Sequence, residues 1–365
     1  MFRILQQFAL FMYACANIDP IHKKPFKASV FYTEKGGVEL RGMKARLSVV
    51  LVVAALLISV ISVPAYGAAL DGWMYEMIGF AEKTEFAENT GLAEVRVALI
   101  DTGVSTKRIN AQWIEQGINY VFEGADTEDL NGHGTRVASL ILGCADEKDN
   151  LYPLAANARL IPLVYHSRYA SGVPKSGGIE AICMAIYDAV DLYGCKVINI
   201  SSGIMIPDDR LEAAVKYAEE NNVIVVSAVG NDNILNPERQ FYPAAYDTVV
   251  GVGAVNSALE PSEFSQRNGV TVCAPGENIT AASIKNSRVF ETVSGTSYAT
   301  AFVTALAASM LGEYPDMTPL EFREILENSC RDIGSPGYDT DSGYGVVNFQ
   351  NAFDYYEEFQ LASLG

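Results

Sequence analysis

Histidine is the rarest ionisable residue in this chain, with three histidines among 365 residues. Cysteine occurs six times, and no Cys-x-x-Cys or Cys/His spacing typical of a zinc site is present. The five cysteines after residue 65 are an odd number and lie mostly in apolar stretches, which favours buried thiols over a disulfide framework. Internal repeats, low-complexity tracts and linkers are also missing from the sequence. These absences argue against a zinc module, a disulfide scaffold and a repeat protein.

Basic side chains are scarce beyond the N-terminal region. Residues 66–365 contain 18 Lys and Arg but 41 Asp and Glu. Such an acidic surface repels phosphate backbones, so we expect no nucleic-acid partner. With 49% apolar and 19% charged residues, the chain has enough apolar surface to bury a large core and is not a disordered sequence.

An apolar run at residues 47–63 follows Arg41, Lys44 and Arg46 and ends in small residues. This pattern is typical of a signal peptide that is cleaved near residues 65–67. The run is also near the minimum length for a membrane span, so a retained anchor that tethers the protein is the alternative. Both interpretations place the remainder of the chain outside the cytoplasm, and we expect a secreted or extracytoplasmic protein, membrane-anchored if the signal is retained.

These features divide the chain into three parts. Residues 1–42 form an N-terminal extension that is either non-native, with translation starting at Met43, or cytosolic. Residues 43–67 form the signal peptide or signal anchor. Residues 68–365 form one folded domain, which we expect to be a monomer.

Short Val- and Ile-rich runs alternate with helical patterns throughout this domain. The apolar runs are VRVALI, RLIPLVY, KVINI, VIVVSAV and TVVGVGAV, and the helical patterns begin near residues 134, 179, 208, 297, 318 and 348. Continuous apolar strands separated by helices of this length are typical of a parallel sheet that is covered on both faces. The sequence therefore predicts an α/β fold with a doubly wound, mostly parallel sheet and helices on both faces.

Three polar residues stand where such a sheet gathers its functional groups, at the carboxyl ends of strands. Asp101 ends an apolar run, His133 stands between two glycines at a helix start, and Asn231 follows VIVVSAVG. Each by itself has an ordinary interpretation as a turn or structural residue. Together they supply a carboxylate, an imidazole and an amide donor, the groups that assist a nucleophilic serine.

Two serines, Ser294 and Ser297, precede the helical pattern in S-G-T-S-Y-A. The stretch alone also fits a simple helix start, in which Ser or Thr caps free N–H groups. A nucleophile in the first turn of a helix gains from the unpaired N–H groups and the positive end of the helix dipole.

These strings resemble the subtilisin-like serine peptidases, the subtilases. The resemblance rests on ALIDTGV, NGHGTRVA and SGTSYATA, in the order Asp, His, Ser, and covers about residues 73–350. It implies that Ser297 rather than Ser294 is the nucleophile, that His133 is the base and that Asp101 orients it. It also implies that Asn231 and the backbone N–H of Ser297 hold the oxyanion.

The string VINISSG resembles the substrate-binding strand of subtilases, and SAVGN resembles the segment that carries their oxyanion-hole asparagine. The resemblance therefore implies four substrate-binding residues, Ser201, Ser202, Gly203 and Gly230. Phe241 is expected to intrude near the primary pocket and to favour small side chains there. The implied function is a serine endopeptidase for protein or peptide substrates. The alternatives are a dedicated processing peptidase or peptide ligase for one exported partner, and a catalytically dead surface binding module.

Several positions depart from the family pattern. Arg136 stands where a histidine is common, and Ala301 and Ala305 stand where the family usually has Pro and Gly. None of these changes removes a catalytic atom. The interval between the signal and Asp101 has no room for the usual pro-domain, so we expect the domain to fold without one.

The expected chemistry needs no cofactor. A structural calcium ion is an open alternative, because acidic side chains gather in three loops, although solvated acidic loops are common and none has EF-hand spacing. Its candidate ligands are Asp126, Glu128, Asp129, Asp146, Glu147, Asp149, Asp339 and Asp341. The sequence does not assign metal ligands among them.

Overall fold

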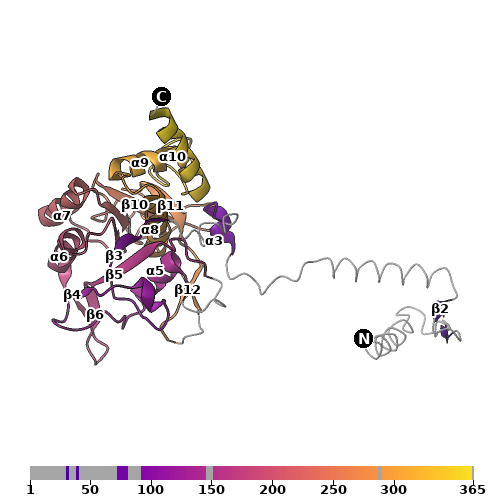
Figure 1. Cartoon of the computed structure of the whole chain (residues 1–365), viewed down its shortest axis with the longest axis horizontal. Coiled ribbons are helices and arrows are strands. Elements are labelled where there is room, and N and C mark those ends of the chain that lie inside the picture. The colour runs from indigo at the N-terminus through magenta and orange to yellow at the C-terminus, as the bar shows by residue number, and fades with distance from the viewer. Residues whose placement is uncertain are drawn as a thin grey trace. The chain divides into compact units, whose positions relative to one another are not determined.

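The computed structural model describes residues 30–32, 38–40, 72–80, 92–144, 151–285 and 290–363 (Figure 1). The chain divides into two compact units, Met1–Ala69 and Leu70–Gly365. In the first unit, β1 (Val30–Tyr32) pairs antiparallel with β2 (Val38–Leu40). The proposed signal at residues 47–63 lies outside the described residues, and the expected domain boundaries stay predictions. Within the described ranges, no helix has both the length and the apolar character that a membrane span requires.

The second unit is built around a seven-stranded sheet in which every pairing is parallel. The strand order is β11-β10-β9-β8-β3-β5-β4. In chain order, the strands are β3 (Val95–Asp101), β4 (Ile118–Asn119), β5 (Ala158–Val164), β8 (Val197–Ile200), β9 (Ile224–Ala228), β10 (Val249–Val255) and β11 (Val272–Pro275). The mostly parallel, doubly wound sheet expected from the sequence is confirmed. Strand β3 lies inside the sheet, with β8 on one side and β5 on the other.

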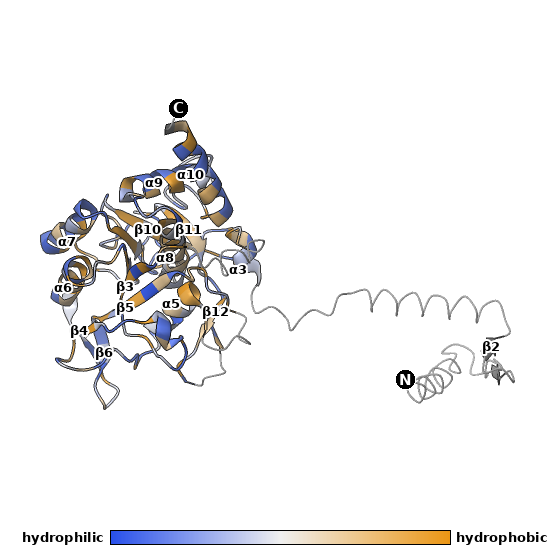
Figure 2. Cartoon of the chain, viewed as in Figure 1, coloured by the Kyte–Doolittle hydropathy of each residue, from blue (hydrophilic) through white to orange (hydrophobic). Residues whose placement is uncertain are grey.

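Helices cover both faces of this sheet because its strands are apolar on both faces. In β3, Val97 and Leu99 belong to one hydrophobic cluster, whereas Ala98 and Ile100 belong to a second one. The first cluster includes α5 (His133–Leu142) and α8 (Thr296–Glu313), and the second includes α6 (Gly178–Asp191) and α7 (Asp209–Glu220). Figure 2 shows hydrophobic residues along the central strands, whereas α7 carries both hydrophilic and hydrophobic residues.

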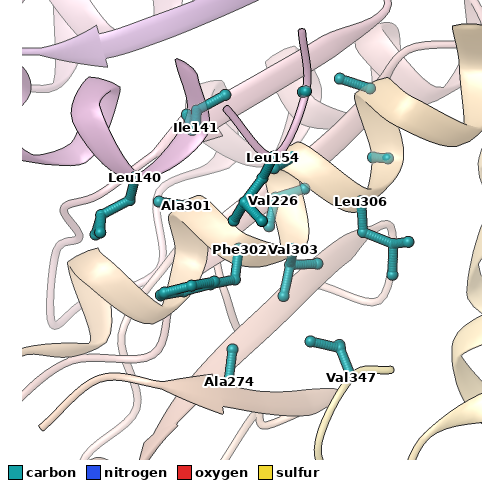
Figure 3. Packing of buried hydrophobic residues seen from close by; sticks show 14 of the residues in the cluster. Leu140, Ile141, Leu154, Val226, Ala274, Ala301, Phe302, Val303, Leu306 and Val347 are labelled. Carbon is teal, nitrogen blue, oxygen red and sulfur yellow. The ribbon is translucent and has the colours of Figure 1, made fainter. Parts of the chain in front are cut away.

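Helix α8 lies in the interior, and every residue from Thr296 to Gly312 is buried. Its side chains belong to one cluster with those of α5, the sheet and the chain near Val347. In Figure 3, Phe302 lies on the side of Ala274, and Val303 lies on the side of Val347. Ala301 and Ala305, the departures from the family pattern, are fully buried in this packing. The helix therefore holds the stretch that begins at Thr296 within the core.

Smaller elements complete the unit. Two antiparallel ribbons pair β6 (His166–Arg168) with β7 (Pro174–Ser176), and β12 (Ile279–Ala282) with β13 (Phe290–Val293). The remaining helices are α3 (Gly72–Met77), the short 3-10 helix η1 (Ala111–Trp113), α9 (Pro319–Ser329) and α10 (Phe349–Ser363). The five cysteines in the described ranges are free thiols, and four of them are buried, as the apolar context predicted.

Candidate active site

Asp101 and His133 are in direct contact at the carboxyl end of the sheet. Asp101 is the last residue of β3 and is 2% exposed, whereas His133 begins α5. The His133 Nδ1 lies 2.8 Å from Asp101 Oδ1 and 3.0 Å from Oδ2. A carboxylate can only accept here, so Nδ1 carries the proton and donates it. The lone pair of the neutral ring is therefore on Nε2, the nitrogen that can act as a base.

The surroundings of His133 favour uptake of a proton. Burial of the imidazole lowers its pKa, but the charge and hydrogen bond of Asp101 outweigh burial, so the pKa of His133 lies above its ordinary value of 6.5. Arg136 acts to lower this pKa, and Asp129 acts to raise it. The imidazole is accordingly a stronger base than free histidine.

Asp129 anchors the N-terminus of α5, a role that the sequence analysis did not assign to it. Its buried carboxylate accepts hydrogen bonds from the backbone N–H groups of Asn131, Gly132 and Thr135 at 2.7–2.9 Å. It also accepts from the hydroxyls of Thr102 at 2.9 Å and Thr135 at 2.7 Å. Gly132 occupies the N-cap position and has no side chain to cap the helix. Asp129 supplies the missing cap from three residues upstream.

The glycine after His133 allows the two loops to meet. A Cβ at Gly134 would lie 2.2 Å from the carbonyl oxygen of Gly103 and 3.1 Å from Asp101 Oδ1. Only a residue without a side chain permits this approach, and it brings the start of α5 against the end of β3.

Ser297 is the second residue of α8 and is 8% exposed. Its hydroxyl donates to the carbonyl of Ser201 at 3.0 Å, and the Ser201 hydroxyl donates to the carbonyl of Ser297 at 3.2 Å. Ser294 has a different position, because its hydroxyl accepts from the backbone N–H of Asn278 at 2.9 Å. The structure thus places Ser297 against the segment after β8, and Ser294 in a turn contact.

Asn231 is fixed by the residue before Ser297. Its Oδ1 accepts from the backbone N–H of Thr296 at 2.8 Å and from the Thr296 hydroxyl at 3.1 Å. The Thr296 hydroxyl in turn accepts from the backbone N–H of Gly230 at 3.3 Å. Because Oδ1 is engaged as an acceptor, Nδ2 is the group of Asn231 that can donate to a ligand.

Phe241 connects the two segments named as substrate-binding. These segments, Ser201–Gly203 and Val229–Asn231, follow the neighbouring strands β8 and β9. A Cβ at Gly230 would lie 2.5 Å from Phe241 Cδ2, and a Cβ at Gly203 would lie 3.3 Å from Phe241 Cβ. The phenylalanine therefore touches both segments. The main chain at Gly203 is exposed, as a peptide-binding edge requires.

A comparison with known families adds to this geometry. The model of the family described as "Subtilase family" matches residues 93–345, which contain all the residues discussed above. The chain belongs to the subtilase family.

Among individual subtilases, subtilisin DY of Bacillus licheniformis is 30% identical over 262 residues, which are 71% of this chain and 91% of that protein. The minor extracellular protease Epr of Bacillus subtilis (strain 168) is 31% identical over 70% of this chain and 38% of its own length. The crystal structure of fervidolysin from Fervidobacterium pennivorans, a keratinolytic enzyme related to subtilisin, matches with a TM-score of 0.67 and 28% identity. That match covers 77% of this chain and 45% of fervidolysin. The chain thus spans less than half the length of Epr and of fervidolysin.

The described carboxylates of this subtilase do not form a metal cluster. No group of three or more His, Cys, Asp or Glu side chains in the described ranges is arranged to hold a metal ion. Asp129 is occupied by its five hydrogen bonds, and Asp339 accepts from backbone N–H groups of Ser335, Asp341 and Ser342. These hydrogen bonds give both carboxylates a structural role that needs no metal ion. The loop with Asp146, Glu147 and Asp149 lies outside the described residues, so calcium binding stays a prediction.

Proposed function

We propose that this subtilase is a serine endopeptidase whose catalytic triad is Asp101, His133 and Ser297. The observation that carries the proposal is the 2.8 Å contact between His133 Nδ1 and the buried Asp101 carboxylate, at the site where α8 begins. That contact leaves Nε2 free to take a proton. The ring of His133 also lies beside that of Tyr298, the residue after Ser297, with centroids 5.6 Å apart.

In the proposed reaction, Ser297 Oγ forms a bond to the carbonyl carbon of a peptide, and its proton passes to His133 Nε2. The carbonyl oxygen becomes an oxyanion that accepts from Asn231 Nδ2 and from the backbone N–H of Ser297. The C–N bond then breaks, and the leaving amine takes the proton from His133. Water repeats these steps on the acyl-enzyme and releases the acid. Before attack, Ser297 Oγ must exchange its hydrogen bond with the Ser201 carbonyl for one with His133.

The substrate of this reaction is an extended segment of protein or peptide. It would pair through its main chain with Ser201, Ser202 and Gly203, with Gly230 on the opposite side of the bound residue. Because Phe241 contacts both segments, we propose that it restricts the residue before the cleaved bond to a small side chain. The apolar run at residues 47–63 supports export of the enzyme, and one relative, Epr, is named as extracellular. We propose a monomer that acts outside the cytoplasm, free or membrane-anchored.

The test is covalent labelling of the full chain with a fluorophosphonate, read by intact mass. Wild type and Ser294→Ala should each gain one label, and Ser297→Ala should gain none. Ser294→Ala is the matched control, because it removes a neighbouring hydroxyl that bonds only a turn. Labelling of folded Ser297→Ala would assign the nucleophile elsewhere. If folded wild type took no label, the proposal would give way to a non-catalytic binding module.

A further inference from the structure

Arg136 connects three elements around the proposed active site. It lies one turn after His133 on α5, and its Nε donates to the hydroxyl of Tyr298 on α8 at 3.1 Å. Its Nη1 donates to Oε2 of Glu291 on β13 at 3.0 Å. The side chains of Arg136 and Glu291 are 17% and 23% exposed, so solvent screens this ion pair less than a surface pair.

Glu291 is itself held in place. Its Oε1 accepts from the Ser283 hydroxyl at 3.0 Å and lies 2.9 Å from Lys285 Nζ. The hydrogen bond from Lys285, together with those of its other partners, lowers the pKa of Glu291, so this carboxylate is ionised at neutral pH. Arg136 therefore binds a fixed anion.

Tyr298 contacts both Arg136 and the imidazole of His133. Tyr298 is 6% exposed, and its ring lies against the ring of His133, with centroids 5.6 Å apart and an interplanar angle of 39°. Burial raises the pKa of Tyr298, which keeps the phenol neutral and able to accept the hydrogen bond from Arg136. The Tyr298 ring that packs against His133 is thus held at its hydroxyl by Arg136, which is itself bound to Glu291.

We propose that Arg136 is a positioning residue for this site: anchored on Glu291, it holds the Tyr298 ring against His133 and places a fixed positive charge one helical turn from the imidazole. The role rests on the proposed function only where it concerns catalysis. The contacts themselves depend on Arg136, which occupies a position where a histidine is common in the family pattern.

The charged residues around His133 shift its pKa in opposite directions. Asp101 from β3 and Asp129 from the preceding loop favour the protonated ring, Arg136 opposes it, and Tyr298 from α8 is neutral. Removing the Arg136 charge should raise the pKa of His133. Removing the Glu291 charge leaves Arg136 uncompensated and should lower that pKa.

The direct test is NMR titration of imidazole ¹⁵N signals in the full chain. With three histidines in the sequence, a His133→Asn sample assigns the signal of interest. All titrations are made in a Ser297→Ala background, which prevents self-digestion.

We expect Arg136→Gln to raise the titration midpoint of His133, and Glu291→Gln to lower it, each by roughly half a pH unit. Arg136→Lys keeps the charge and, as the control, should keep the midpoint near that of the parent. If Arg136→Gln does not fold, the expected fall in Glu291→Gln still tests the charge arrangement. Unchanged midpoints, or shifts in the same direction, would overturn the proposal.

Steady-state kinetics test whether the hydrogen bond between Arg136 and Tyr298 positions His133 for catalysis or only packs the core. In the Ser297 enzyme, Tyr298→Phe removes only the hydroxyl that Arg136 binds, and we expect kcat to fall about tenfold with little change in KM. The acidic limb of kcat/KM against pH should move with the NMR midpoints in Arg136→Gln and Glu291→Gln. Unchanged kcat in Tyr298→Phe would overturn the positioning role. The two proposals can fail separately. If the wild type neither reacts with the fluorophosphonate nor cleaves peptide, the proposed function is rejected. Shifts of the His133 midpoint in opposite directions would even then support the charge arrangement around His133.

Discussion

At the scale of single residues, Asn231 is positioned without help from a substrate. Its Oδ1 is held by the backbone N–H and hydroxyl of Thr296, the residue just before the proposed nucleophile. An amide fixed in this way does not reorganise when charge develops on a bound carbonyl oxygen. Such preorganised donors act on the transition state more than on the bound substrate.

Replacing Asn231 by alanine should therefore lower kcat by roughly 10²–10³-fold with little change in KM. Steady-state kinetics on a chromogenic peptide would measure both constants. Asn233→Ala is a nearby control, because the amide of Asn233 donates to the carbonyl of Glu263 at 2.9 Å, away from Thr296. A loss confined to KM, or an equal loss of kcat in the control, would contradict the oxyanion role.

Phe241 carries a prediction about specificity. Its side chain contacts both Gly203 and Gly230 and so occupies space that a large substrate side chain would need. Wild type should prefer Ala, Ser or Gly before the cleaved bond. Phe241→Gly should raise kcat/KM for Leu or Phe at that position by roughly 10–100-fold, with cleavage after Ala as the internal control. A peptide library differing only at this residue would show the change. Efficient cleavage after Phe by wild type would exclude the restriction.

At the scale of elements, the helix that carries His133 depends on a residue outside it. Asp129 is 3% exposed, and its carboxylate accepts five hydrogen bonds, three of them from backbone N–H groups at or near the start of α5. An amide in its place has one acceptor oxygen instead of two and adds donors where donors already converge.

Asp129→Asn should lower the free energy of unfolding by about 3 kcal/mol. Urea denaturation in a Ser297→Ala background would measure this without self-digestion. Asp126→Asn is the matched control in the same loop, because its carboxylate accepts one exposed hydrogen bond, from the Glu128 N–H at 3.3 Å. Equal stabilities of the two variants would contradict the capping role. If EDTA destabilised wild type but not Asp129→Asn, a metal bound at Asp129 would explain the result instead.

At the scale of the whole molecule, the folded unit is strongly acidic, since residues 66–365 hold 41 acidic and 18 basic side chains. A field of this sign raises the encounter rate with cationic substrates and lowers it with anionic ones, and salt screens the difference.

We therefore compare two peptides with the same cleaved bond, one with distal Lys residues and one with distal Glu residues. The Lys peptide should have the larger kcat/KM at low salt. The ratio should fall as ionic strength rises from about 10 mM to about 500 mM, where the Debye length is only a few ångströms. A ratio that does not change with salt would show that the net charge has no part in substrate encounter.

Much of this protein follows from local sequence patterns. Apolar runs predicted five of the seven strands of the sheet and its parallel arrangement, and helical periodicity predicted α5, α6, α7, α8, α9 and α10. The strands that were missed are β4 (Ile118–Asn119), which has two residues, and β11 (Val272–Pro275), whose sequence VCAP is not the Val- and Ile-rich run by which the others were found. The motif strings around Asp101, His133, Asn231 and Ser297 were readable because each is contiguous in the chain, although their catalytic roles stay a proposal.

Only the tertiary structure shows the contacts between residues that are far apart in the chain. In the sequence, Asp129 is one of several acidic residues in an acidic loop, and only the fold shows that its carboxylate caps α5. The contacts of Arg136 with Glu291 and Tyr298 join residues more than 150 positions apart. Periodicity and capping signals arise from neighbours in the chain, so the sequence by itself determined the elements and the motif strings. Strand order and loop packing depend on long-range burial, and for that reason only the folded molecule determined which side chains meet around His133.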